Sequence, residues 1–250
     1  MPVKLNEEDV LSRVKNPLIR EQYFEFQNKI ELTIRFERVT NRVRSRCKYE
    51  SGSTEFIIKL KDNFIEKDLA HELMHGQVWF IDNYGILECT NPICQLITDY
   101  IEDIVIHSQM FNSLKILPFD RAFRRKRRRW ARKLFKGESL IDSYYESQGI
   151  IVWKLYKALL YVHVWHLNNM IKTYKEFNNF MKSFKKRYRL EEEYKLAENI
   201  INIVRNNNHL SNRENYDNAL NQISNINYLN ITGYKKIKHY VKKEIGYSLV

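Results

Sequence analysis

Apolar and polar residues alternate in several short stretches near the start of the chain. Ile30 to Val39 alternates over its whole length, which predicts a half-buried strand. Val43 to Tyr49 and Thr54 to Leu60 are two further predicted strands, with Ser51-Gly52-Ser53 as the turn between them. Together these stretches predict a small antiparallel sheet.

The stretches before and after these predicted strands have apolar residues at helical spacing. An opening helix is predicted from Glu7 to about Gln27, broken or bent at Pro17, and Ile65 to Phe80 is predicted as the next helix. Another runs from Asn91-Pro92 to about Leu114, because proline fits the first helical turn. The helices predicted after Gly149 are Ile150–Met170, Ile171–Leu190 with a break near Asn168-Asn169, Glu191–Arg205, one opened by a Ser211/Glu214 capping box, and Thr232–Glu244.

The predicted fold class is therefore α+β: a small antiparallel sheet with its helices, and an all-helical C-terminal region. The predicted domains are residues 1–137 and 138–250. With 44% hydrophobic residues and seven glycines in 250 residues, the chain has the composition of a packed protein. No apolar run reaches the ~18 residues that a membrane span needs, so no membrane partner is expected.

The three cysteines, Cys47, Cys89 and Cys94, form no even set. Unpaired thiols of this kind are typical of a reducing compartment. The N-terminal residues do not have the pattern of a signal peptide. A cytoplasmic location is therefore predicted.

The predicted helix over Ile65–Phe80 contains His71-Glu72-Leu73-Met74-His75. Residues four apart stand on one helix face about 6 Å from each other, so His71 and His75 can share one zinc ion. Glu72, one position round, can then reach a water molecule on that metal. Leu73 and Met74 are uncharged, as a helix buried beneath an active site requires. The motif predicts a Zn²⁺ site.

Strands leading into such a helix, followed by an acidic helix, resemble the zincin superfamily of zinc metallopeptidases over about residues 30–112. The metzincin branch does not fit, because Val78 and Ile81 stand where its extended motif has glycine and histidine. The chain looks most like the gluzincin branch, whose third ligand is a carboxylate on the following helix. The resemblance implies a protein or peptide substrate, hydrolysed by a zinc-bound water that Glu72 activates.

Three acids of the next helix compete for the place of that third ligand. The Glu-x-x-x-Asp pattern of the gluzincins falls on Asp99 and Asp103, where the ligand would be a shorter aspartate. Glu102 has the usual side chain but poorer register, and its longer reach tolerates more displacement of the helix. Glu102 is the predicted ligand, with Asp99 and Asp103 as alternatives. A zincin usually also has a hydrogen-bond donor that stabilises the oxyanion formed during hydrolysis. The candidates for this donor are His107, Tyr144, Tyr145 and His163, which the sequence does not rank.

A strongly basic stretch supports an alternative function. The predicted helix from Asp120 to Lys136 carries ten cations and no acid after its first residue, in a chain of net charge +12. Such a helix offers guanidinium groups to phosphates. The alternative is a protein that binds nucleic acid or another polyanion, with a structural zinc or none. The residues predicted to bind are Arg124, Arg125, Arg128, Arg129 and Arg132.

Overall fold

The structure is a computed structural model that describes residues 3–30, 32–40, 45–49, 53–86, 92–116, 140–171 and 190–226. The chain divides into two compact units. The first comprises residues 1–86, 106–118 and 242–250, and the second residues 87–105 and 119–241. One helix, α4 (Pro92–Asn112), contributes residues to both units. The predicted division, which separates residues 1–137 from 138–250, has a different boundary.

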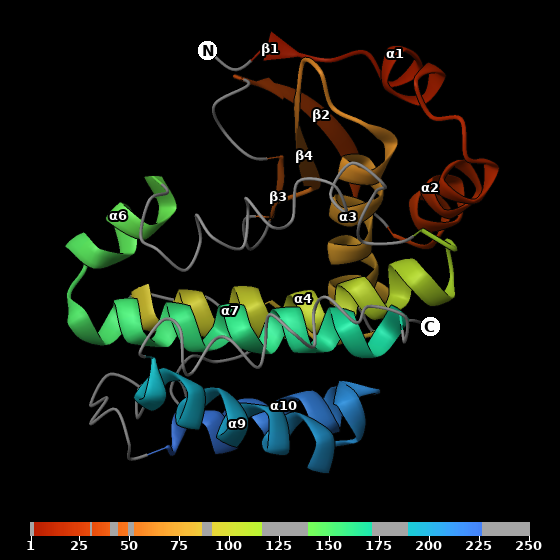
Figure 1. The fold of residues 1–250 in the computed structure, drawn as a ribbon. Helices are drawn as coiled ribbons and strands as arrows, with labels where there is room; N and C mark the ends of the chain where they lie inside the picture. Colours follow the sequence, from red (N-terminus) through yellow and green to blue (C-terminus); the bar gives the residue numbers. More distant parts are fainter. Residues whose placement is uncertain are drawn as a thin grey trace. The chain divides into compact units, whose positions relative to one another are not determined.

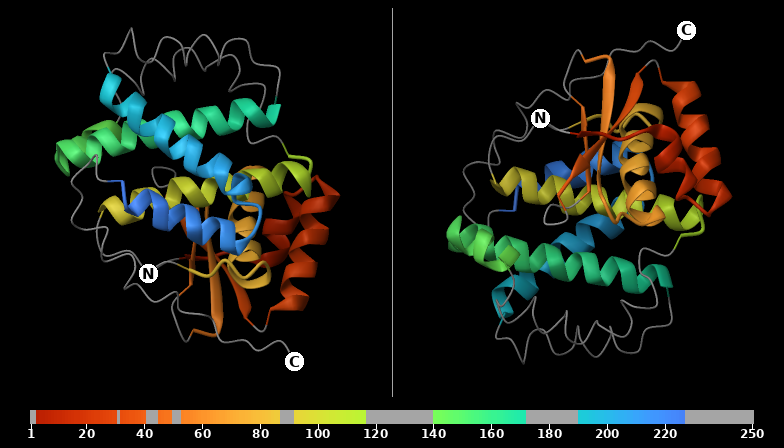
Figure 2. Two further views of the ribbon diagram at one scale, coloured as in Figure 1. Left: turned by 90° about the horizontal axis from the view of Figure 1, so that it is seen from below. Right: turned by 90° about the horizontal axis from the view of Figure 1, so that it is seen from above.

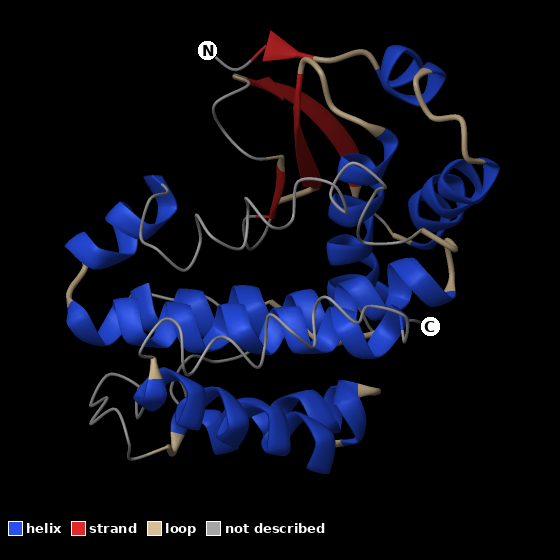
Figure 3. Cartoon of the chain, in the orientation of Figure 1, coloured by secondary structure: helices blue, strands red, loops and turns tan. Residues whose placement is uncertain are grey.

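The described strands form one sheet in the first unit (Figures 1 and 3). Its order is β1-β2-β4-β3, in which β2 and β4 are parallel and the two outer pairings are antiparallel. The strands are β1 (Val3–Lys4), β2 (Thr33–Val39), β3 (Arg46–Tyr49) and β4 (Glu55–Lys61). The α+β class is confirmed, but the prediction of an antiparallel sheet is wrong. The alternation of apolar and polar residues indicates which side chains face the core. It does not indicate the order of the strands, and here β4 lies between β2 and β3 and runs parallel to β2.

Helices α2 and α3 pack against one face of the sheet. From this face Phe36, Phe56 and Ile58 are almost fully buried, and the ring of Phe26 in α2 meets that of Phe56 edge to face. The helices of the first unit are α1 (Glu7–Ser12), α2 (Pro17–Lys29) and α3 (Glu66–Gly76), and the five-residue π-helical turn η1 (Gln77–Ile81) follows α3. The predicted opening helix is thus two helices, since Asn16 caps a new helix that starts at Pro17.

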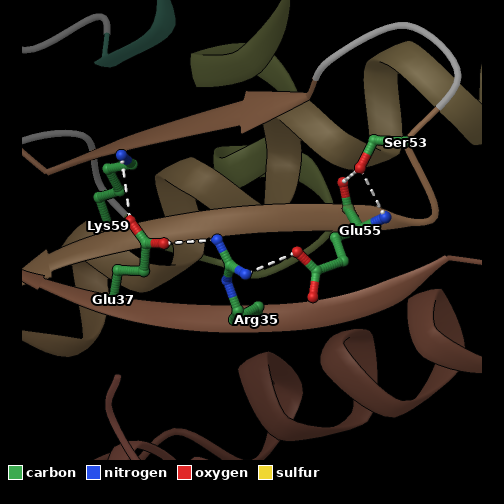
Figure 4. A network of polar contacts seen from close by, with 5 residues as sticks. All are labelled: Arg35, Glu37, Ser53, Glu55 and Lys59. Atoms are coloured by element: carbon green, nitrogen blue, oxygen red, sulfur yellow. Dashed lines mark hydrogen bonds and ion pairs between the residues drawn. The ribbon is translucent and has the colours of Figure 1, made fainter. Parts of the chain in front are cut away.

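The other face of the sheet carries a polar network (Figure 4). Glu37 of β2 accepts from Arg35 at 2.6 Å and from Lys59 of β4 at 3.1 Å, and Arg35 also pairs with Glu55 at 2.7 Å. Burial alone would raise the pKa of Glu37. The hydrogen bonds and positive charges of Lys59 and Arg35 outweigh that effect, and together they hold the pKa of Glu37 below its ordinary value. The network thus joins the two parallel strands.

The described part of the second unit is helical. Its elements, besides the first residues of α4, are α6 (Leu140–Ser147), α7 (Ile150–Ile171), α9 (Glu191–Asn206), the 3₁₀ turn η2 (Asn208–Leu210) and α10 (Arg213–Ser224). Helix α9 packs against both α7 and α10 (Figure 2). No described helix is long and apolar enough to span a membrane.

Two details of the second unit differ from the predictions. Helix α7 continues through Asn168-Asn169 to Ile171, so the predicted break is absent there. The cap of α10 is Asn212, whose side chain accepts from the backbone N–H of Asn215 at 2.9 Å, and not Ser211. The hydroxyl of Ser211 and the amide oxygen of Asn212 can both accept such a hydrogen bond, and the backbone path into the helix decides between them. The predicted helix Thr232–Glu244 lies outside the described residues.

Candidate metal centre

Helix α3 positions the histidine motif as the sequence predicts. Leu69, Leu73 and Met74 are 0–1% exposed and anchor the helix in the core. His71 and His75 are half-buried on a different side, and Glu72 is only 4% exposed. The helix is therefore held by its apolar face, and both imidazoles remain accessible to a ligand.

The Nε2 atoms of His71 and His75 lie 3.3 Å apart, with the ring centroids 4.9 Å apart. Two nitrogens bound to one tetrahedral zinc at ~2.0–2.1 Å are separated by ~3.3–3.4 Å. The same separation lets one imidazole donate an N–H to the other in the absence of a metal. The two rings could therefore hold one zinc ion, and imidazole nitrogens are donors that suit this metal.

A third imidazole stands beside this pair. His107 of α4 is buried, and its ring centroid lies 5.4 Å from that of His71. The end of α4 is attached to the first unit, because Gln109 donates a hydrogen bond to Asp82, the residue after η1. The sequence pointed to His107 only as an oxyanion donor. Its place beside His71 comes from packing, and no local spacing indicates it.

The three acids of α4 can be compared by their angle around the helix axis from His107. At about 100° per residue, Asp103 lies ~40° round the helix axis from His107, Asp99 ~80° and Glu102 ~140°. Asp99 is exposed, Glu102 is buried and Asp103 is half-buried. A carboxylate oxygen of Asp103 also lies within 4.8 Å of a ring nitrogen of His163 in the second unit. Of the three acids, Asp103 is the one nearest to the side of α4 that carries His107.

A cysteine completes the group of donors around α3. The Sγ atom of Cys47, a carboxylate oxygen of Glu72 and a ring nitrogen of His75 all lie within 4.8 Å of one another. Cys47 pairs with the fully buried Ile58 in the antiparallel ladder of β3 and β4. Sequence reasoning counted Cys47 only as a thiol, and alternation along a four-residue strand is too weak a signal to reveal this position.

Aromatic rings border the donors on the side of η1. Trp79 lies 5.3 Å from His75 between ring centroids, and it meets Phe56 and Phe80 edge to face. Tyr49 of β3 packs on Phe80 at 5.2 Å. A single π-helical turn in place of an α-helical one changes the direction of the side chains that follow it, and such turns are frequent at functional sites.

The remaining histidines and tyrosines named from the sequence lie in the second unit. Tyr145 stacks on Tyr156 at 4.5 Å, and Tyr144 is exposed. Burial, followed by the neighbouring His163 and His209, lowers the pKa of His166 to about 3, so this histidine is neutral in the core. The suitability of Tyr144, Tyr145 and His163 as oxyanion donors stays a prediction.

Two other predictions concern cysteines and cations. Cys94 is disulfide-bonded, so the prediction of a thiol at this position is wrong, and a disulfide does not favour a reducing compartment. The basic stretch with Arg124, Arg125, Arg128, Arg129 and Arg132 lies outside the described residues. Its binding to nucleic acid stays a prediction.

Comparisons of the chain with models of protein families, with curated proteins and with solved structures found no match. The resemblance to zincins therefore rests on the motif at His71–His75, and a function has to be argued from the geometry of the residues.

Proposed function

We propose that the protein is a zinc-dependent peptidase whose metal centre is built on His71 and His75. The observation that carries the proposal is the 3.3 Å separation of their Nε2 atoms, next to the buried carboxylate of Glu72. Glu72 follows His71 directly in α3, so beside two zinc ligands its carboxylate is placed to hold and deprotonate a water molecule.

The third protein ligand in this proposal is Asp103. It precedes His107 by one turn of α4, and His107 lies against His71. Glu102, the ligand expected from side-chain length, lies on another side of the helix, and Asp99 is exposed. Two histidines and one carboxylate are a ligand set that leaves a fourth position of a catalytic zinc open.

The chemistry is divided between the metal and Glu72. Zinc in this set would lower the pKa of water toward ~7 and polarise the carbonyl of the peptide bond. Glu72 takes the proton from the attacking water and then gives it to the leaving amine. Trp79 and His107 border the histidines and limit the access of bulk water, which strengthens electrostatic interactions there.

The test compares wild type with Glu72→Gln, using zinc-loaded protein and a library of internally quenched peptides. The substitution keeps the size of the side chain and removes the proton acceptor, so the variant should fold, keep its zinc and lose ~10²–10⁴-fold in rate. Glu25→Gln is the matched control, because Glu25 is an exposed residue of α2 that forms an ion pair with Lys29, four residues further along the same helix.

Three results would contradict the proposal. Full activity of Glu72→Gln would show that Glu72 is not the general base. Loss of zinc from that variant would make Glu72 a ligand. A wild-type protein that binds no zinc would show that His71 and His75 do not form a zinc site.

A further inference from the structure

We propose that Cys47 is an additional ligand of the same metal centre and that its thiolate closes the position needed by the attacking water. This inference rests on the metal centre of the proposed function and goes beyond it, since it assigns the protein a closed, inactive state. The closed state has Cys47 bound to the metal, and the open state has Cys47 displaced.

The distances carry the first step. Sγ of Cys47 lies within 4.8 Å of both a ring nitrogen of His75 and a carboxylate oxygen of Glu72. A sulfur and a nitrogen bound to one tetrahedral zinc at ~2.3 and ~2.0 Å are about 3.6 Å apart. Coordination therefore needs Sγ of Cys47 to move from within 4.8 Å of the His75 nitrogen to about 3.6 Å from it, by a change of side-chain rotamer.

The position of the thiol supplies the second step. Cys47 has both the proposed ligand His75 and the proposed base Glu72 as neighbours, and an attacking water must have the same two neighbours. The thiol and the water therefore compete for one position. Thiolate is among the preferred ligands of zinc, and sites with four protein ligands are closed to substrate.

The proposal requires the side chain of Cys47 to move in and out of this position, and within the described part of the sheet β3 is held from one side only. Strand β3 is at the edge of the described sheet and is hydrogen-bonded there to β4 alone. The chemistry balances without a further reactant. Binding of Sγ forms one sulfur–metal bond and releases one proton from the thiol to solvent, and displacement by water reverses both changes.

The same cysteine and histidine would also suit a nucleophile with its base. We prefer the metal ligand, because the imidazole of His71, 3.3 Å from that of His75 between Nε2 atoms, adds a further donor that a cysteine nucleophile and its base do not need. The nucleophile remains an outcome of the experiment.

The experiment uses Co²⁺, which substitutes for zinc and absorbs light according to its ligands. The apoprotein is titrated with Co²⁺ as wild type, Cys47→Ser, Cys47→Ala and Arg46→Ala. Arg46 is the exposed neighbour of Cys47 on β3, so its substitution disturbs the same strand and leaves the thiol. The expected wild-type spectrum has the d–d bands of tetrahedral Co²⁺ and a thiolate-to-metal charge-transfer band. That band should persist in Arg46→Ala and disappear in both Cys47 variants.

The outcomes separate this inference from the proposed function. Tetrahedral Co²⁺ without a thiolate band in wild type overturns the role of Cys47 and leaves the peptidase proposal standing. No Co²⁺ binding by wild type overturns both. If neither Cys47 variant folds, iodoacetamide labelling of wild type followed by peptide mapping decides: zinc should slow the labelling of Cys47 at least ~10-fold, and equal rates with and without zinc would refute the inference. Inactivation by labelling, with activity that needs no metal, would instead identify a nucleophile.

Discussion

A Cβ atom on Gly76 would lie 2.5 Å from Cζ of Phe26. It would also lie 3.0 Å from Cε1 of Phe56, so α3, α2 and the sheet approach one another at the residue directly after His75. Glycine is thus required there by the close approach of two aromatic rings, and the position of the second histidine depends on that contact.

Gly76→Ala should lower the free energy of unfolding by ~1–3 kcal/mol through overpacking, although alanine favours helix over glycine by ~1 kcal/mol. Urea denaturation measures the loss. Phe26→Leu shortens the opposing ring, so the double variant should lose less than the sum of the two single losses. Additive losses would mean that the two residues do not press on each other.

His71→Ala and His75→Ala should each weaken zinc binding by more than ~100-fold, because a direct ligand contributes more than the hydrogen-bonding partners behind it. Competition with a chromogenic chelator measures the affinity. His209→Ala is the control, since His209 is an exposed histidine of the second unit. If either α3 variant kept the wild-type affinity for zinc, the substituted histidine would not be a ligand of the metal centre.

Asp103→Asn should weaken zinc binding about as much as the histidine substitutions, because an amide is a poor ligand for zinc. Glu102→Gln and Asp99→Asn should stay within ~10-fold of wild type. The three variants make the same chemical change at three angles on one helix, so their comparison identifies the acid that faces the metal. A large effect at Glu102 alone would restore the ligand expected from side-chain length.

Glu37→Gln should lower the free energy of unfolding at pH 7 by ~1–3 kcal/mol, because a buried hydrogen-bonded charge between Arg35 and Lys59 is lost. The folded pKa of Glu37 is below its unfolded value of about 4.5. Its contribution is therefore complete above the unfolded pKa and is lost as the pH falls through the folded pKa. Urea denaturation between pH 7 and pH 3 should show wild type and variant converging at low pH. A difference that does not change with pH would mean that ionisation of Glu37 does not stabilise the fold.

Interactions between residues close in the chain were predictable from the sequence. The pair His71 and His75 lies on one helix face because residues four apart always do so on a helix. The burial of Leu73 and Met74 follows from the same periodicity. Alternation likewise predicted β2 and β4 to within three residues at each end.

Only the tertiary structure decided which distant groups meet α3. The parallel pairing of β2 with β4, the place of Cys47 next to His75, and the ring of His107 beside His71 join residues that no local pattern relates. Such contacts follow from the simultaneous packing of many side chains, which no short stretch of sequence records. The sequence by itself therefore determined that His71 and His75 share one helix face with Glu72 beside them, and packing determined what surrounds them.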